Sequence, residues 1–217
     1  KTLTERYSGL LRRAQQLNSD DIFQGILNAY TMSIDPHSSY FSQRTSENFR
    51  IRMSLSLEGI GAILQSEDDM TLIKEIVPGG PADLTGKVDA EDRIVGIGQN
   101  EDPILDVVGW RLDNVVDLIR GPKGTTVRLE VLKKDLPVGS PTQVISIVRN
   151  TIKLEDQAAQ KAVLRVETPD KDFSVGVITV PTFYLDFDGK KKGNDDYRST
   201  TKDVTGLIDE LVSEDII

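Results

Sequence analysis

The sequence predicts an α+β fold in three parts. Near the N-terminus, apolar residues recur at helical spacing, which indicates a helical segment. Short alternating strands follow, separated by glycine and proline turns, and they predict a β-sandwich or partial barrel that includes two helices. After Arg149, strand and helix patterns alternate again, as at the start of an α/β core. We therefore expect domains at residues 1–53, 54–149 and 150–217.

The N-terminal part carries two helical patterns. The first has apolar residues on one face at Leu3, Tyr7, Leu10, Leu11 and Ala14, and the second at Ile22, Ile26, Leu27 and Tyr30. Asp20 or Asp21 is a suitable N-cap for the second helix. Asp35-Pro36 ends it, because proline disfavours helix at the residue before it. We expect this part to be a helical subdomain that packs on the rest.

Two glycines frame one apolar residue in Leu57-Glu58-Gly59-Ile60-Gly61-Ala62, directly before the apolar pair Ile63-Leu64. Successive N–H groups of a glycine-rich turn can form a concave site for an anion. The strand that follows can accept an extended peptide on its free edge. Together these features resemble a PDZ domain, with the N–H groups of Gly59, Ile60 and Gly61 holding a C-terminal carboxylate.

The elements of such a module follow in order. We expect strands at 70–77, 92–97, 125–132 and 144–149, a turn into a short helix at 78–82, and a longer helix at 107–119. The long helix places Val108, Leu112, Val115 and Ile119 on one face, and Gly121-Pro122 ends it. Trp110 lies off that face, where it either braces the helix against a neighbouring domain or covers the module's flank.

The last part shows strand patterns at 161–166 and 173–179, joined by the turn Thr168-Pro169-Asp170. Residues 186–194 are polar and glycine-bearing, which indicates an exposed loop. Residues 203–212 predict a helix, and Ile216-Ile217 the first step of another strand.

Composition excludes several classes of function. The net charge of −9 in 217 residues argues against nucleic-acid binding, which needs clustered lysine and arginine. There is no cysteine, hence no disulfide or thiolate metal site, and no apolar run long enough to span a bilayer. We expect no metal and no cofactor: Asp186-Phe187-Asp188-Gly189 is followed by Lys190, where a calcium loop needs an oxygen ligand.

Two short motifs fail on inspection. His37, the only histidine, is flanked by Ser38 and Ser39, but catalytic triads meet through the fold rather than along the sequence, so we expect a structural role. Gly121-Pro122-Lys123-Gly124-Thr125 has its lysine before the last glycine and fails as a phosphate loop.

A collinear set of motifs resembles the C-terminal processing, or tail-specific, serine proteases of peptidase family S41. The resemblance rests on residues 53–62, 79–82, 92–99, 108–116 and 119–124, with 34–40 before the module and 152–156 and 175–178 after it. It implies a periplasmic protease whose PDZ domain binds the apolar C-terminal tails of substrate proteins, and it leaves room for a membrane-associated adaptor as a further partner.

The resemblance also implies a catalytic serine and a lysine base, and no position here matches either. The first residue is Lys1, and we expect a fragment that ends before the serine segment and is inactive by itself. The expected peptide-binding residues are Leu57, Gly59, Ile60, Gly61, Ala62, Ile63, Leu112, Val115 and Ile119. The alternative is a stand-alone PDZ adaptor without hydrolase activity, which would not need the flanking motifs.

Overall fold

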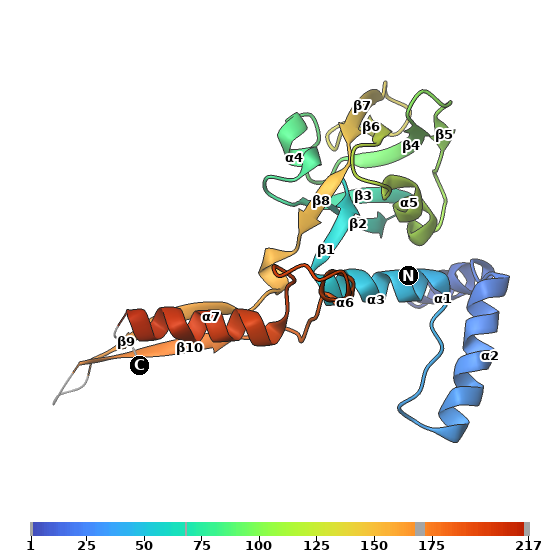
Figure 1. The fold of residues 1–217 in the computed structure, drawn as a ribbon. Helices are drawn as coiled ribbons and strands as arrows, with labels where there is room; N and C mark the ends of the chain where they lie inside the picture. The colour runs from blue at the N-terminus through green and yellow to red at the C-terminus, as the bar shows by residue number, and fades with distance from the viewer. Residues whose placement is uncertain (1, 68, 168–171, 215–217) are drawn as a thin grey trace. The chain divides into compact units, whose positions relative to one another are not determined.

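The computed structural model describes residues 2–67, 69–167 and 172–214. The predicted turn at 168–170 and the strand start at 216–217 lie outside these residues. The chain forms two compact units, Lys1–Arg52 and Met53–Ile217 (Figure 1). Our further division at residue 149 stays a prediction.

The first unit is helical, as predicted. It contains α1 (Thr2–Gln15), α2 (Ser19–Ile34) and most of α3 (Gln43–Ser54). The N-cap of α2 is Asn18 rather than Asp20 or Asp21, because the Asn18 Oδ1 accepts from the Asp21 N–H at 2.9 Å. The Asp21 carboxylate accepts from the Asn18 N–H at 3.1 Å, which completes a capping box.

The second unit contains a six-stranded antiparallel sheet in the order β2-β3-β4-β6-β7, with β5 also paired to β4. The bounds are β2 (Ala62–Glu67), β3 (Met70–Ile76), β4 (Arg93–Gln99), β5 (Leu105–Asp106), β6 (Thr126–Leu132) and β7 (Gln143–Val148). Two helices belong to it, α4 (Pro81–Thr85) and α5 (Leu112–Ile119). The expected sheet module with two helices is confirmed.

One apolar core holds this module together. Side chains from β3, β4, β6, β7, α4, α5 and the segments between them form a single buried cluster, whose members are Ile60, Ile73, Ala82, Val88, Ile94, Ile97, Val107, Val115, Ile119, Val127, Leu129, Val131, Ile145 and Ile147. Burial of apolar surface on this scale is the main source of stability in a domain of this size.

The helix predicted from residue 107 begins only at Leu112. Gly109 has φ +77°, and its N–H donates to the carbonyl of Asp69 at 2.6 Å. The Val108 N–H donates to the Asp106 Oδ1 at 2.9 Å, which sets a local turn instead of a helical one. Val108 and Trp110 therefore lie in the loop before α5, and our assignment of Val108 to its apolar face was wrong.

A two-stranded ribbon, β1 (Ser56–Gly59) paired with β8 (Asn150–Lys153), brackets the module in sequence. Beyond it lie the short helix η1 (Glu155–Gln157), the hairpin of β9 (Gln160–Val166) and β10 (Phe173–Thr179), and α7 (Thr200–Ser213) alongside the hairpin (Figure 1). Leu55, Ala158 and Tyr184 form a second, small buried cluster.

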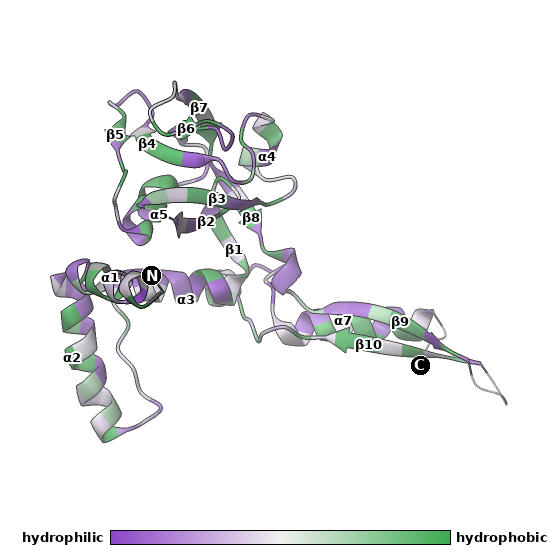
Figure 2. Ribbon diagram, turned by 180° about the vertical axis from the view of Figure 1, so that it is seen from behind, coloured by the Kyte–Doolittle hydropathy of each residue, from purple (hydrophilic) through white to green (hydrophobic). Residues whose placement is uncertain are grey.

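The segment at 186–194, expected as an exposed loop, contains the short helix α6 (Phe187–Lys191). The Asp186 carboxylate caps it by accepting from the Gly189 N–H at 2.9 Å. Figure 2 shows that hydrophobic and hydrophilic residues mix along α7, β9 and β10, and large apolar side chains there remain exposed: Val163, Leu164, Phe173, Val175 and Ile208.

Candidate functional site

The glycine-rich turn joins the ribbon to the edge of the sheet. β1 ends at Gly59 and β2 begins at Ala62, so Ile60 and Gly61 alone make the connection. Gly59, Ile60 and Gly61 are all buried. Gly61 has φ +75°, a left-handed conformation that glycine adopts without strain. The turn predicted from the two glycines is therefore present, and its backbone needs a glycine at position 61.

The carbonyl groups of this turn are bound on one side. The Ile60 carbonyl accepts from the Ala82 N–H at 2.8 Å, and the Gly61 carbonyl accepts from the Val77 N–H at 2.9 Å. In a trans peptide, the next residue's N–H points away from the carbonyl, so the N–H groups of Gly61 and Ala62 point away from those partners. Within the described part of the chain, the N–H groups of Ile60 and Gly61 donate no hydrogen bond. The turn thus offers unused donors to an anion.

Close packing behind the turn also requires glycine, at position 61 and at position 80. A Cβ built on Gly61 would lie 3.2 Å from the Gly80 Cα, and one built on Gly80 would lie 2.9 Å from the Val77 carbonyl oxygen. The two glycines let the turn and the segment before α4 approach each other. A side chain at either position would push the turn out of place.

β2 supplies the wall next to this turn. It is an edge strand that pairs only with β3, and α5 packs beside it. A Cβ on Gly59 would lie 4.0 Å from the Cγ of Arg120, the residue after α5. The C-terminal end of α5 therefore lies by the turn. A free strand edge beside a helix is an arrangement to which an extended peptide can add.

The predicted site residues fall into four environments. Ile60, Val115 and Ile119 belong to the buried core, with at most 4% of each exposed. Leu57, Ala62 and Leu112 are half-buried, and Gly59 and Gly61 form the turn. Ile63 is 46% exposed. The structure brings the turn, β2 and α5 together.

Sequence reasoning missed Glu58. Its carboxylate accepts from the Lys123 N–H at 3.1 Å and so ties the start of the turn to the loop between α5 and β6. No pattern in the sequence pairs these residues, which lie 65 positions apart.

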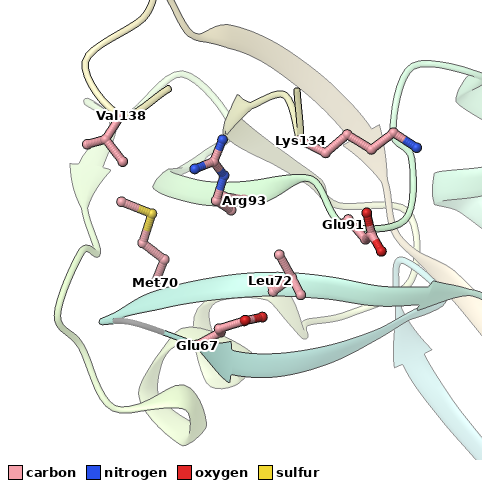
Figure 3. A pocket seen from close by; sticks show the side chains of 7 residues that line it. All are labelled: Glu67, Met70, Leu72, Glu91, Arg93, Lys134 and Val138. Atoms are coloured by element: carbon pink, nitrogen blue, oxygen red, sulfur yellow. The ribbon is translucent and has the colours of Figure 1, made fainter. Parts of the chain in front are cut away.

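A second concavity lies on the same sheet. It has a volume of about 440 Å³ and is lined by Glu67, Met70, Leu72, Glu91, Arg93, Lys134 and Val138 (Figure 3). The Nη2 of Arg93 donates to two carbonyls, that of Lys133 at 3.0 Å and that of Leu136. Figure 3 shows the Glu67 side chain on β2 and the Lys134 side chain extending on the side of the pocket where Glu91 lies.

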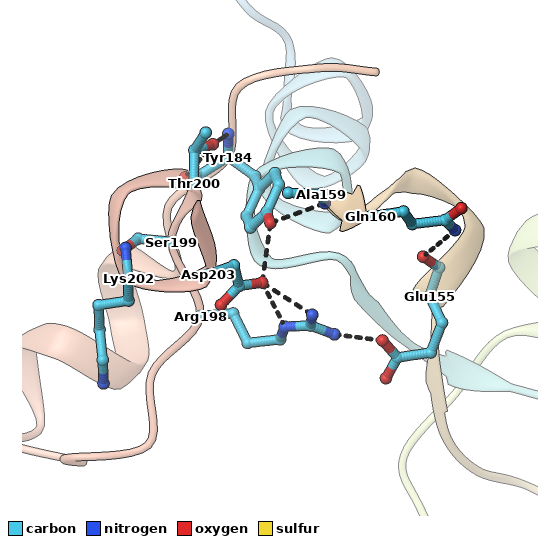
Figure 4. A network of polar contacts seen from close by, with 9 residues as sticks. All are labelled: Glu155, Ala159, Gln160, Tyr184, Arg198, Ser199, Thr200, Lys202 and Asp203. Atoms are coloured by element: carbon cyan, nitrogen blue, oxygen red, sulfur yellow. Dashed lines mark hydrogen bonds and ion pairs between the residues drawn. The ribbon is translucent and has the colours of Figure 1, made fainter. Parts of the chain in front are cut away.

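A polar network beyond the ribbon serves a structural purpose (Figure 4). The buried Tyr184 hydroxyl donates to the Asp203 Oδ2 at 2.8 Å and accepts from the Ala159 N–H at 3.0 Å. Arg198 donates to Asp203 at 2.8 Å and to Glu155 at 2.6 Å. Burial raises the pKa of Tyr184; the bond from Ala159 opposes this, and donation to Asp203 adds to it.

Residues 2–67, 69–167 and 172–214 contain no cluster of acidic and histidine side chains that could hold a metal ion. Over the same residues, no helix is long and apolar enough to cross a membrane.

Two family models match the chain: the tail-specific protease N-terminal domain over residues 1–44 and the PDZ domain over residues 49–132. The tail-specific protease of Haemophilus influenzae is 45% identical over 183 residues, which cover 84% of this chain and 25% of that protein. The carboxy-terminal processing protease CtpA of Bacillus subtilis is 29% identical over 198 residues, or 91% of this chain and 36% of that protein. The chain thus spans a quarter to about a third of these relatives.

A solved structure, the PDZ domain of a carboxy-terminal protease from Vibrio cholerae in complex with peptide, is 52% identical. The match covers 46% of this chain and 99% of that one, with a TM-score of 0.44.

Proposed function

Because this chain belongs to the family of tail-specific, C-terminal processing proteases, we propose that its PDZ domain captures the C-terminal tails of substrate proteins. The observation that carries the proposal is the turn at Ile60 and Gly61, whose N–H groups are unused and lie next to a free strand edge. Peptide binding by the PDZ domain from Vibrio cholerae supports it.

The proposed site holds the terminal carboxylate on the backbone N–H groups of Ile60, Gly61 and Ala62, in the turn that begins after Gly59. The N–H group of Gly59 is directed elsewhere. The Leu154 N–H donates to the Leu55 carbonyl, and backbone groups along β1 face β8 at every second residue from there, so Gly59 faces Asn150. Hydrogen bonds to a charged acceptor are short and strong. The last side chain of the tail then lies between β2 and α5, where Leu57, Ile63 and Leu112, with the edges of Val115 and Ile119, favour an apolar residue.

Calorimetry with an apolar-tailed peptide and its C-terminally amidated twin tests this proposal. Amidation removes the charge that the turn binds, and each charge-assisted bond contributes about 1.5–3 kcal/mol, so affinity should fall by about tenfold or more. Equal affinities would refute carboxylate capture.

Gly61→Val provides an independent test in the protein. A β-branched residue resists positive φ, and its Cβ meets Gly80, so peptide affinity should fall while the sheet remains folded. Gly139→Val is the matched control, since Gly139 has φ +92° but open space around it in the loop between β6 and β7. If both variants bind like the parent, Gly61 is not part of the site.

We further propose that residues 1–217 supply recognition and no catalysis. The family resemblance implies a serine and lysine dyad, and no position here matches its serine segment or its lysine. Incubation of the chain with an apolar-tailed unfolded protein should give no cleavage by mass spectrometry. Cleavage that a serine substitution within these residues abolishes would overturn this.

The match to the tail-specific protease N-terminal domain over residues 1–44 favours the protease over a stand-alone adaptor. A periplasmic location and a membrane-associated adaptor as partner belong to the same proposal, on family membership alone. Fractionation of the source cells, followed by mass spectrometry of cross-linked partners, tests both.

A further inference from the structure

The free edge of β2 determines which backbone groups a bound tail would pair with. In an antiparallel pair, backbone groups turn toward each neighbour at alternate residues. Because the Gly61 carbonyl bonds to Val77 on the β3 side, the backbone groups of Ala62, Leu64 and Ser66 face the open edge. The bulge in this pairing places its extra residue, Lys74, on β3, so β2 keeps the alternation.

The register of the tail follows, given the proposed function on which this inference rests. With the carboxylate in the turn at Ile60 and Gly61, the last tail residue, position 0, lies opposite Ala62. An extended antiparallel tail then places position −1 opposite Ile63, and so on to position −5 opposite Glu67.

Opposite residues of an antiparallel pair share one face of the sheet. Ala62 and Leu64 pack against the core, so positions 0, −2 and −4 face α5. The side chains of Ile63, Gln65 and Glu67 are exposed on the other face, and they meet positions −1, −3 and −5.

Glu67 is the charged member of this outer row. It is exposed, and no described cation forms an ion pair with it. Its partner in register is Met70, which is uncharged. Glu67 shares its pocket with two cations, Arg93 and Lys134 (Figure 3). Arg93 donates to the loop carbonyls of Lys133 and Leu136 instead of to Glu67.

We propose that Glu67 is a specificity-determining residue that favours tails with lysine or arginine at position −5. A basic side chain at that position projects onto the outer face directly opposite the carboxylate. Opposite charges directly across an antiparallel pair stabilise it, and like charges destabilise it. The site then reads two features of a tail: an apolar end and a basic residue five positions before it.

The test uses the whole 217-residue chain and eight-residue peptides with one apolar tail that differ only at position −5. Calorimetry at low salt should show lysine binding about two- to fivefold tighter than serine, and glutamate weaker than serine. In Glu67→Gln the three peptides should bind alike, and in Glu67→Lys the order should reverse. Glu75→Gln, which removes a charge opposite Ile63, is the matched control and should keep the parent order.

A peptide with lysine moved to position −4 should lose the advantage, because that side chain faces α5. Equal binding of the lysine and serine peptides to the parent chain would overturn the role of Glu67, and so would an unchanged order in Glu67→Gln. The amidated lysine peptide separates the two levels: if amidation still abolishes binding, carboxylate capture stands and only the inference on Glu67 fails. If no peptide binds, both fail.

Discussion

The PDZ module and the segment after Lys153 are built in different ways. The module buries one continuous apolar cluster that its strands and α5 share. In the later segment, the small cluster of Leu55, Ala158 and Tyr184 is linked to the network of Asp203, Arg198 and Glu155. Packing therefore dominates the first region and directional polar contacts the second. The two should respond differently to lost volume, lost charge and pH.

Loss of volume should produce the largest effect, and only in the module. Leu129 on β6 is fully buried, so Leu129→Ala should lower the free energy of unfolding by about 3 kcal/mol through lost transfer energy and a cavity. Leu164→Ala on β9, where the side chain is 54% exposed, should change it by about 0.5 kcal/mol or less. Urea unfolding, followed by circular dichroism and by the single tryptophan, Trp110, measures both. Equal losses would contradict the comparison.

A polar contact inside the packed module should come next in size. The Asp92 carboxylate is fully buried and accepts from the Lys133 Nζ at 2.8 Å and from the Asp89 N–H at 2.9 Å. Asp92→Asn removes a buried charge from beside a cation and should cost about 2 kcal/mol, below the range for fully buried pairs because Lys133 is partly exposed. Asp89→Asn is the control: its exposed carboxylate contacts the same ammonium at 2.8 Å, and its effect should be much smaller. A larger loss in Asp89→Asn would mean that burial does not set the strength here.

The sequence predicted the elements whose signal is local. β2 follows the glycine turn, β3 and β6 match within one residue of their predicted bounds, and β10 matches fully. The start of α5 was missed because the Gly109 turn is fixed by a bond to Asp69, forty positions away and invisible to periodicity. The helix α3 was not predicted either, since QRTSENFRIRMS is mostly polar and shows a weak apolar face.

The site divides in the same manner. Two glycines around one apolar residue predicted the turn, because glycine adopts the positive φ of Gly61 without strain and this preference is visible in the sequence. The bond from Lys123 to Glu58 and the ion pair of Asp92 with Lys133 join residues 65 and 41 positions apart, and only the fold brings them together. Helical spacing predicted Val115 and Ile119 as part of the peptide site, but spacing cannot separate residues that would line such a site from those that fill the core behind it, where both are buried.

The smallest of these stability effects should arise in the polar segment, and it should depend on pH. Tyr184→Phe leaves the Ala159 N–H without its acceptor and removes one of the donors to Asp203, which still accepts from Arg198, at a cost of about 1 kcal/mol. The pKa of Tyr184 is raised above its ordinary value of 10.0, so the folded chain holds this proton more tightly than the unfolded chain. The stability that the hydroxyl contributes is therefore complete below about pH 10 and is lost as the pH rises through the folded pKa.

Unfolding of the parent chain, Tyr184→Phe and the exposed control Tyr7→Phe between pH 8 and pH 11 measures this effect. The parent and Tyr7→Phe should lose stability together at alkaline pH, whereas the Tyr184→Phe curve should be flatter. Because the network lies beyond Lys153, the Trp110 signal of the module should move less than the amide exchange of β9 and β10. Parallel curves for all three proteins would mean that the network adds nothing that the small apolar cluster does not already supply, and the two regions would then differ in extent of packing alone.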